Sequence, residues 1–306
     1  METVLAGAMF AALFTVWWVK KPAWSANVYG RELPPRPAPA EVPPRGLVGF
    51  ADAATFRPDI EGLRALAVIL VLLFHARFPL FAGGLIGVDV FFVLSGFLIT
   101  SLLLRELSTT GTVSLANFWA RRARRLLPAS GLVLIATVLA ARFIVDPLTQ
   151  VTIARDGLAA ALFAANVHFF RGGTNYLAEG LPESPLLHFW SLAVEEQFYV
   201  VWPGLLLVLV RHARLRRAAL ATLMAVAWVV SLGLCVWMTY RGADEQSWAF
   251  FMLPARAWEL LSGALLALFA PALARVARGA VRTLALAGWV GLGVVVGTAL
   301  VVTKTG

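Results

Sequence analysis

The residues best suited to chemistry in this sequence are ionisable side chains inside long apolar runs. In "IEGLRALAVILVLLFH", Arg64 and His75 stand eleven positions apart. Eleven helical residues turn through about 1100°, close to three full turns, and rise by about 16 Å. We therefore expect both side chains on one face of a helix, at two depths. Because ionisable groups inside membrane helices usually face a cavity or a partner, this pattern favours function over headgroup snorkelling by Arg64 and simple packing of His75.

The next apolar run, "GVDVFFVLSGFLIT", brings Asp89 to about the depth of His75. A buried carboxylate beside a histidine would orient the ring and raise its basicity, as a general base requires. Capping of the helix start by Asp89 is an equally good interpretation. Ser95 and Gly96 are interpreted as small residues for close helix packing, because this "SG" lacks the nucleophile elbow of hydrolases.

A second polar set lies in "HFWSLAVEEQFYVVWP". His188, Ser191 and Glu195 follow i, i+3, i+7 spacing and share one helical face, whereas Glu196 lies on the adjacent face. Both carboxylates stand well past the first turn. We therefore expect a functional role for them, more than simple complementation of the helix N-terminus.

A third pair of charges occurs in "PARAWELLSG", where Arg256 and Glu259 are three residues apart. At this spacing the two side chains can form an ion pair within an apolar helix. The pattern is equally compatible with a structural role and with a role in function.

The segment "RRARRLLP" concentrates four arginines at the start of another apolar run. Its sign matches the positive-inside rule for cytoplasmic loops. Its density also suits phosphate binding, for which guanidinium groups are well shaped. The residues concerned are Arg121, Arg122, Arg124 and Arg125.

Composition identifies the elements that must position these residues as membrane helices. Hydrophobic residues make up 60% of the 306 residues and the mean hydropathy is +0.79, against roughly 45–50% apolar residues in ordinary globular chains. The net charge of +9 comes mainly from arginines in short segments between apolar runs, so it indicates orientation and not nucleic-acid binding. Cys235 is the only cysteine and the four histidines are dispersed, so we expect neither a disulfide nor a metal site.

The sequence therefore predicts an all-α polytopic bundle of about eight transmembrane helices, each near the ~20 residues that a crossing needs. Residues 1–21 are interpreted as an extra N-terminal anchor helix, and 22–55 as a proline-rich linker. The basic clusters at 121–125, 211–217 and 275–282 share the cytoplasmic side only if the weaker run 151–170 does not cross. We expect that run to be an interfacial or partly inserted helix on the outer face. The other predicted crossings are 63–81, 85–104, 126–145, 189–210, 218–240, 248–271 and 283–302.

Taken in order, these five motifs resemble the membrane acyltransferase-3 family. The resemblance implies an acyltransferase domain over 56–306, shorter at its C-terminal end than the family's bundle of about ten helices. It places the family's essential Arg and His on Arg64 and His75, and its basic loop on Arg121, Arg122 and Arg125. Its acidic helix falls on Glu195 and Glu196, and its later Arg and Glu on Arg256 and Glu259.

The family further implies an inner (plasma) membrane enzyme that transfers an acyl group, often acetyl, from acyl-CoA to an envelope carbohydrate or glycolipid. Arg64 and the 121–125 cluster would hold the nucleotide phosphates, while His75, oriented by Asp89, would deprotonate the acceptor. Glu195 or His188 could serve as the base instead. A covalent route is open, although no nucleophile stands out. A transporter or flippase and an inactive fragment are the alternatives.

Overall fold

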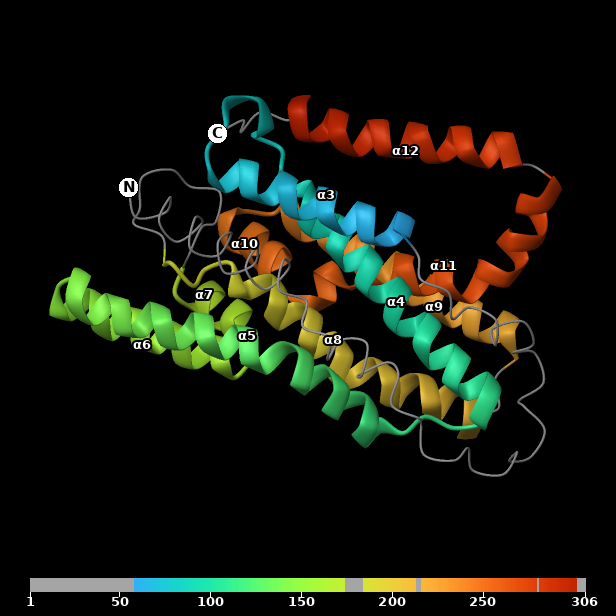
Figure 1. The fold of residues 1–306 in the computed structure, drawn as a ribbon, viewed down its shortest axis with the longest axis horizontal. Coiled ribbons are helices and arrows are strands. Elements are labelled where there is room, and N and C mark those ends of the chain that lie inside the picture. The colour runs from blue at the N-terminus through green and yellow to red at the C-terminus, as the bar shows by residue number, and fades with distance from the viewer. Residues whose placement is uncertain (1–57, 174–183, 213–215, 280, 302–306) are drawn as a thin grey trace.

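The computed structural model describes residues 58–173, 184–212, 216–279 and 281–301 (Figure 1). These residues form helices joined by turns, with no strand among them, which confirms the predicted all-α class. The anchor predicted at 1–21 and the linker predicted at 22–55 lie outside the described residues.

Five helices in the described residues are long and apolar enough to cross a membrane. Two further helices complete the bundle, α3 with charges in its first turns and α12 with a shorter apolar part. The long helices are α3 (Pro58–His75), α4 (Ile86–Thr110), α5 (Leu115–Ile144), α8 (Phe189–Leu207), α9 (Arg217–Thr239), α11 (Leu253–Gly279) and α12 (Val281–Val301). The short ones are α6 (Pro147–Ala161), α7 (Ala165–Arg171), α10 (Ala243–Phe251), a 3₁₀ turn (Pro79–Phe81) and a π turn (Val208–His212).

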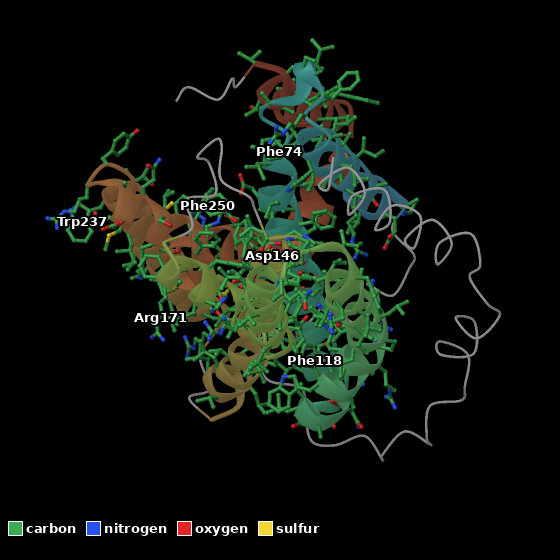
Figure 2. All side chains as sticks on the ribbon, turned by 90° about the vertical axis from the view of Figure 1, so that its left-hand side faces the viewer. Phe74, Phe118, Asp146, Arg171, Trp237 and Phe250 are labelled. Carbon is green, nitrogen blue, oxygen red and sulfur yellow. The ribbon has the colours of Figure 1, made fainter. Side chains whose placement is uncertain are left out.

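The long helices define two ends of the bundle (Figure 1). We call the end at which α3 finishes with His75 the His end: α5 also finishes there, α4, α8 and α11 begin there, and the short helices α6, α7 and α10 gather there. We call the opposite end the Arg end, because the first turns of α5 carry the basic cluster 121–125 there. Figure 2 views the bundle from the His end and shows side chains filling the space between the helices, with Trp237 of α9 pointing outward.

Helix α4 is the centre of the bundle and packs against α3, α8 and α11. Its closest approach is to α11, where a Cβ added at Gly96 would lie 1.9 Å from the Leu260 carbonyl oxygen. On α11, a Cβ added at Gly263 would lie equally close, 1.9 Å from the carbonyl oxygen of Val93. Such mutual contact of backbones at glycine is how apolar helices pack without a hydrophobic driving force. The packing role predicted for Gly96 is confirmed.

Three predicted boundaries differ from the structure. The run 63–81 is not one helix, because α3 ends at His75 and Arg77 has a left-handed φ of 53°. His75 therefore stands at a helix end and not deep inside a span. The cluster 121–125 is not a loop, since α5 already begins at Leu115; arginine and alanine are good helix formers and nothing interrupts them. The run 248–271 is split between α10 and α11 at Met252.

The weak run 151–170 forms the short helices α6 and α7, neither of which reaches spanning length. Phe163, with φ 53°, separates the two. This agrees with the prediction that the run does not cross. Asp146 caps α6 by accepting hydrogen bonds from the backbone N–H groups of Leu148 and Thr149, and Pro147 occupies the first helical position.

Candidate active site

The two histidines of the predicted site meet at the His end. His75 ends α3, and its Nδ1 lies 2.8 Å from the carbonyl oxygen of Val71, one turn earlier. His188 immediately precedes α8 and lies close enough to His75 for the two rings to interact electrostatically. An imidazole nitrogen facing a carbonyl must carry the proton, so Nε2 is the basic nitrogen of neutral His75.

Asp89 lies beside Arg256 at the crossing of α4 and α11. Its Oδ1 accepts a hydrogen bond of 2.8 Å from Nη2 of Arg256, and Nη1 of Arg256 lies 2.9 Å from Oε1 of Glu259. The ion pair predicted between Arg256 and Glu259 is therefore confirmed. The guanidinium also lies 5.6–5.7 Å from the centres of three aromatic rings, those of Phe92, Trp190 and Phe250.

The structure thus gives Asp89 a partner that the sequence interpretation did not. Nδ1 of His75 is oriented by a backbone carbonyl, and the bond described for the Asp89 carboxylate goes to Arg256. Helix α4 begins after Leu85, so Asp89 is in the first turn without serving as the N-cap. The physical reason is the close contact of α4 with α11, because a guanidinium buried there requires a counter-charge.

A second polar group lies deeper in the bundle, where α4 meets α8. Ser95 Oγ and the Tyr199 hydroxyl both donate hydrogen bonds to the same oxygen, Oε1 of Glu195. Ser95 and Tyr199 are also within hydrogen-bonding reach of each other. The Arg122 guanidinium lies 4.0 Å from the centre of the Tyr199 ring. The Ser95–Glu195–Tyr199 group therefore links the core to the basic cluster.

The remaining predicted residues of α8 point to different neighbours. Ser191 bonds to the carbonyl of His188 at 3.2 Å within its own helix. Glu196 lies within electrostatic range of Arg122. Gln197, next in sequence, exchanges hydrogen bonds with the buried Asn166 of α7. The "EEQ" triplet thus fixes α8 against α4, α5 and α7 in turn.

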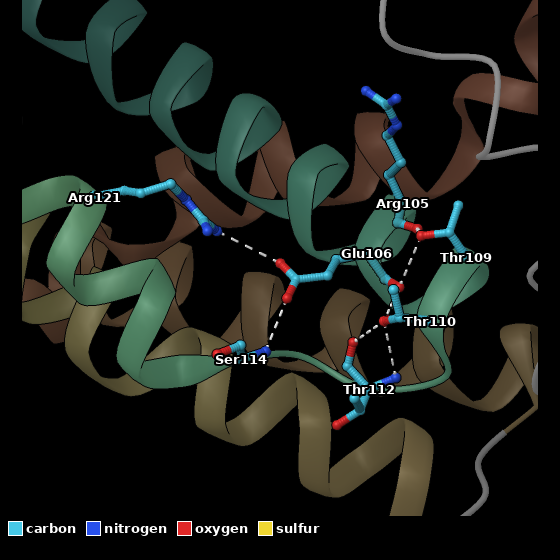
Figure 3. A network of polar contacts seen from close by, with 7 residues as sticks. All are labelled: Arg105, Glu106, Thr109, Thr110, Thr112, Ser114 and Arg121. Atoms are coloured by element: carbon cyan, nitrogen blue, oxygen red, sulfur yellow. Dashed lines mark hydrogen bonds and ion pairs between the residues drawn. The ribbon is translucent and has the colours of Figure 1, made fainter. Parts of the chain in front are cut away.

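The basic residues of the Arg end are partly engaged by carboxylates. Arg121 lies 3.6 Å from Glu106, whose other oxygen accepts the Ser114 N–H at 2.8 Å and so holds the α4–α5 connection (Figure 3). Arg64 lies 3.2 Å from Glu61 on the same helix. Arg124 and Arg125 are exposed. These arginines therefore lie at or near the surface of that end.

Sequence reasoning did not single out Tyr199, and it did not predict the hydrogen bond from Ser95 to Glu195. Ser95 and Glu195 are one hundred positions apart, and only the packing of α4 on α8 joins them. The one available signal was the i, i+4 spacing of Glu195 and Tyr199, which places both on one side of α8. The aromatic rings around Arg256 gave no local signal, because their contact is entirely tertiary.

Comparison with known proteins identifies related acyltransferases. The family model described as an acyltransferase domain (Acyl_transf_3) matches residues 57–303. The peptidoglycan O-acetyltransferase OatA of Listeria monocytogenes is 40% identical over 219 residues, which are 70% of this chain and 34% of that protein. The O-acetyltransferase OatA of Staphylococcus aureus (strain NCTC 8325) is 38% identical over 216 residues, 71% of this chain and 35% of that protein.

The chain spans about a third of the length of these curated relatives. No solved structure matches it. The family model nevertheless covers all of the described residues, including every residue of both polar groups. The chain belongs to the Acyl_transf_3 acyltransferase family.

Proposed function

We propose that this chain is an integral membrane O-acyltransferase of the plasma membrane. It moves an acyl group, most simply acetyl, from cytoplasmic acyl-CoA to a hydroxyl of an envelope carbohydrate or glycolipid, of which peptidoglycan is one candidate. The observation that carries the proposal is the closeness of His75 to His188, with the Asp89–Arg256 hydrogen bond joining α4 to α11, in a family whose named relatives are O-acetyltransferases.

The Arg end is the donor side of this proposal and faces the cytoplasm, as its positive charge favours. The CoA phosphates require cationic partners that exchange easily. Arg121 and Arg64 each face one partly exposed carboxylate, at 3.6 and 3.2 Å. Exposed pairs of this kind contribute only about 0–1 kcal/mol, so a phosphate competes well for both arginines. Arg122 and Arg125 complete the proposed phosphate site.

His75 is the proposed general base of the acceptor step. Its Nδ1 faces the Val71 carbonyl, and Nε2 is the nitrogen that takes the proton from the acceptor hydroxyl in this proposal. Because the ring ends α3, it lies at the end of the bundle that this proposal assigns to the outer side, from which the acceptor arrives. The neighbouring His188 assists in holding the acceptor.

Asp89, Arg256 and Glu259 act in this proposal as a framework. They form a chain of charge contacts that joins α4 to α11. Glu259 is fully buried and Arg256 is enclosed by aromatic rings, so neither is placed to exchange with bulk solvent. Ser191 and Glu196 are assigned to the same supporting role on α8.

The test is transfer of label in membranes that contain this chain. Permeabilised membranes receive labelled acetyl-CoA and a mixed envelope-glycan extract, and label is counted in alkali-labile ester. We expect His75→Ala to reduce it by at least about 100-fold, the usual contribution of a general base. His168→Ala is the matched control, because His168 is a half-exposed histidine held by Asp156 at 2.8 Å, on α7. Equal label from wild type and His75→Ala would exclude His75 as the base, and no label from wild type would contradict acyl transfer by this chain.

A further inference from the structure

The Ser95–Glu195–Tyr199 group has no assigned step in the scheme above, although its geometry is that of an activated nucleophile. A hydroxyl hydrogen-bonded to a base, with the base held by a third group, is the general signature of covalent catalysis. Ser95 supplies the hydroxyl, Glu195 the base and Tyr199 the third group. We propose that Ser95 is the nucleophile that accepts the acyl group from the donor and carries it as an ester before the acceptor step.

Packing alone does not account for this group. Close approach of α4 to α11 is already provided by Gly96, next to Ser95, which has no side chain to accommodate. A carboxylate inside a membrane bundle is expensive and is retained mainly where it functions. Glu195 is only half buried while Ser95 is 9% exposed, so the carboxylate is the more accessible of the two. The hydroxyl is thus held against a base that is itself less enclosed by protein.

The Ser95–Glu195–Tyr199 group lies between the proposed donor site and the proposed acceptor site. On one side, Tyr199 contacts Arg122 of the basic cluster. On the other side, Glu195 stands seven residues after His188 on α8, a helix rise of about 10 Å. A donor whose phosphates lie at the Arg end therefore meets Ser95 before it reaches His75. This inference rests on the proposed function, since it divides that reaction into two steps.

The directions in which the side chains lean reduce the offset along the bundle between Ser95 and His75. Side chains lean toward the N-terminus of their own helix. Because α4 and α8 begin at the His end, Ser95 and Glu195 lean toward it, whereas α3 finishes there and His75 leans back into the bundle. An acyl ester on Ser95 and the imidazole of His75 thus approach each other from the two levels, with the acceptor hydroxyl between them.

The two steps balance without any further reagent. In the first, Ser95 Oγ attacks the thioester carbonyl, its proton passes to Glu195, the C–S bond breaks and the CoA thiolate leaves to take a proton from water on the donor side. In the second, the acceptor oxygen attacks the Ser95 ester and gives its proton to His75. The bond from the acyl carbon to Ser95 Oγ then breaks, and Glu195 returns its proton to Ser95. His75 releases its proton to water, which neutralises the hydroxide left when the CoA thiolate was protonated.

Trapping the ester tests this step. Purified full-length chain is mixed with labelled acetyl-CoA, without acceptor, and quenched in acid. We expect label on the peptide that contains Ser95, cleaved by alkali, and a rise toward one acetyl group per chain in His75→Ala, where the second step is blocked. Ser95→Ala should abolish the label and reduce transfer to acceptor by at least about 100-fold. Ser101→Ala, a half-buried serine on the same helix, is the matched control.

A second variant tests the Ser95 step even if Ser95→Ala misfolds. Ser95→Cys should convert the ester into a thioester, which neutral hydroxylamine cleaves, and this change of chemistry identifies the attachment atom. One combination of results would overturn the Ser95 step and leave the proposed function standing. In it, wild type transfers label to the acceptor, no protein label forms even in His75→Ala, and Ser95→Ala retains activity. If neither acceptor nor protein is labelled, both are wrong for this chain.

Discussion

Helices α4 and α5 follow each other in the chain and are both apolar enough to cross a membrane, yet they occupy different surroundings. In the most apolar stretch of α4, 39% of the residues are buried, against 6% in α5. Helix α4 carries small and polar residues at its contacts, whereas α5 presents large apolar side chains outward. The former include Gly87, Asp89, Ser95, Gly96 and Thr100, and the latter Leu127, Leu132, Ile135 and Leu139.

The difference teaches that apolar character selects the helices that cross, while small and polar residues select those that pack inside. In lipid, an exposed leucine is as well solvated as a buried one, so leucine gives no preference for the interior. A glycine or a charged group does, because it gains a backbone contact or a counter-charge only from another helix. Matched substitutions on the two helices and their partners test this.

The largest loss of stability is expected from removing the Arg256 guanidinium, which lies on α11 and pairs with Asp89 of α4. Arg256→Met would leave Asp89 and the fully buried Glu259 without their cation. Breaking a buried pair costs about 3–5 kcal/mol, and we expect the lower end because the Asp89 side chain is 33% exposed. Thermal unfolding of detergent-purified chain measures the loss. Arg142→Met at the exposed end of α5 should change stability very little; equal losses from the two variants would contradict the distinction.

A smaller effect is expected from adding one methyl group at the helix crossing. In Gly96→Ala, the new Cβ would meet the Leu260 carbonyl oxygen at 1.9 Å and its carbonyl carbon at 2.7 Å, so the backbones of α4 and α11 must separate. Overpacking of this kind costs about 1–3 kcal/mol. In Gly131→Ala on α5 the Cβ meets nothing within 4 Å, and we expect stability to hold or rise slightly. Both are measured by the same unfolding assay. Tolerance of alanine at position 96 would show that the crossing is looser than described.

A third substitution removes a single buried hydrogen bond. Trp202 of α8 donates to Oγ1 of Thr100 on α4 at 2.9 Å, and both residues are buried. Thr100→Val keeps the shape and leaves the indole N–H without an acceptor, which costs about 1–2 kcal/mol. Thr137→Val on α5, where the residue is half buried, should cost less. Intrinsic tryptophan fluorescence during unfolding reports on this contact, and a Thr137→Val loss as large as that of Thr100→Val would argue against the difference between α4 and α5.

The sequence predicted the class, the spans and the first members of the site for identifiable reasons. Apolar runs near twenty residues long mark both ends of α9 and the start of α4 to within one residue, while α4 continues six residues beyond its predicted end. The i, i+3 spacing marked the pair of Arg256 and Glu259, which the structure confirms. These are local properties, set by helix geometry alone.

What the sequence did not predict depends on tertiary contact. The sequence predicts either His75 or the start of its own helix as the partner of Asp89, but the glycine crossing places α11 and its Arg256 beside it instead. The bond between Ser95 and Glu195 joins helices one hundred residues apart. No spacing rule relates positions on different helices, so such pairs follow only from the packing.

The smallest effect is expected at the exposed junction after α5. Asp146 accepts hydrogen bonds from the Thr149 hydroxyl and from the backbone N–H groups of Thr149 and Leu148, and these bonds hold its pKa below the ordinary value of 3.8. A lowered pKa in the folded state means that the carboxylate adds stability above the unfolded pKa, and that this contribution is lost as pH falls through the folded one.

Asp146→Ala should therefore lower the thermal unfolding temperature slightly at pH 7, and the difference from wild type should shrink toward pH 3. Because the group is exposed to water and lies outside the spans, we expect a smaller change than at any α4 contact. Unfolding curves of both proteins across this pH range measure it. If the difference in unfolding temperature is independent of pH, the aspartate acts through its shape and not its charge. A difference as large as that caused by Thr100→Val would show that the α5–α6 junction contributes to the stability of the bundle as much as an α4 contact does.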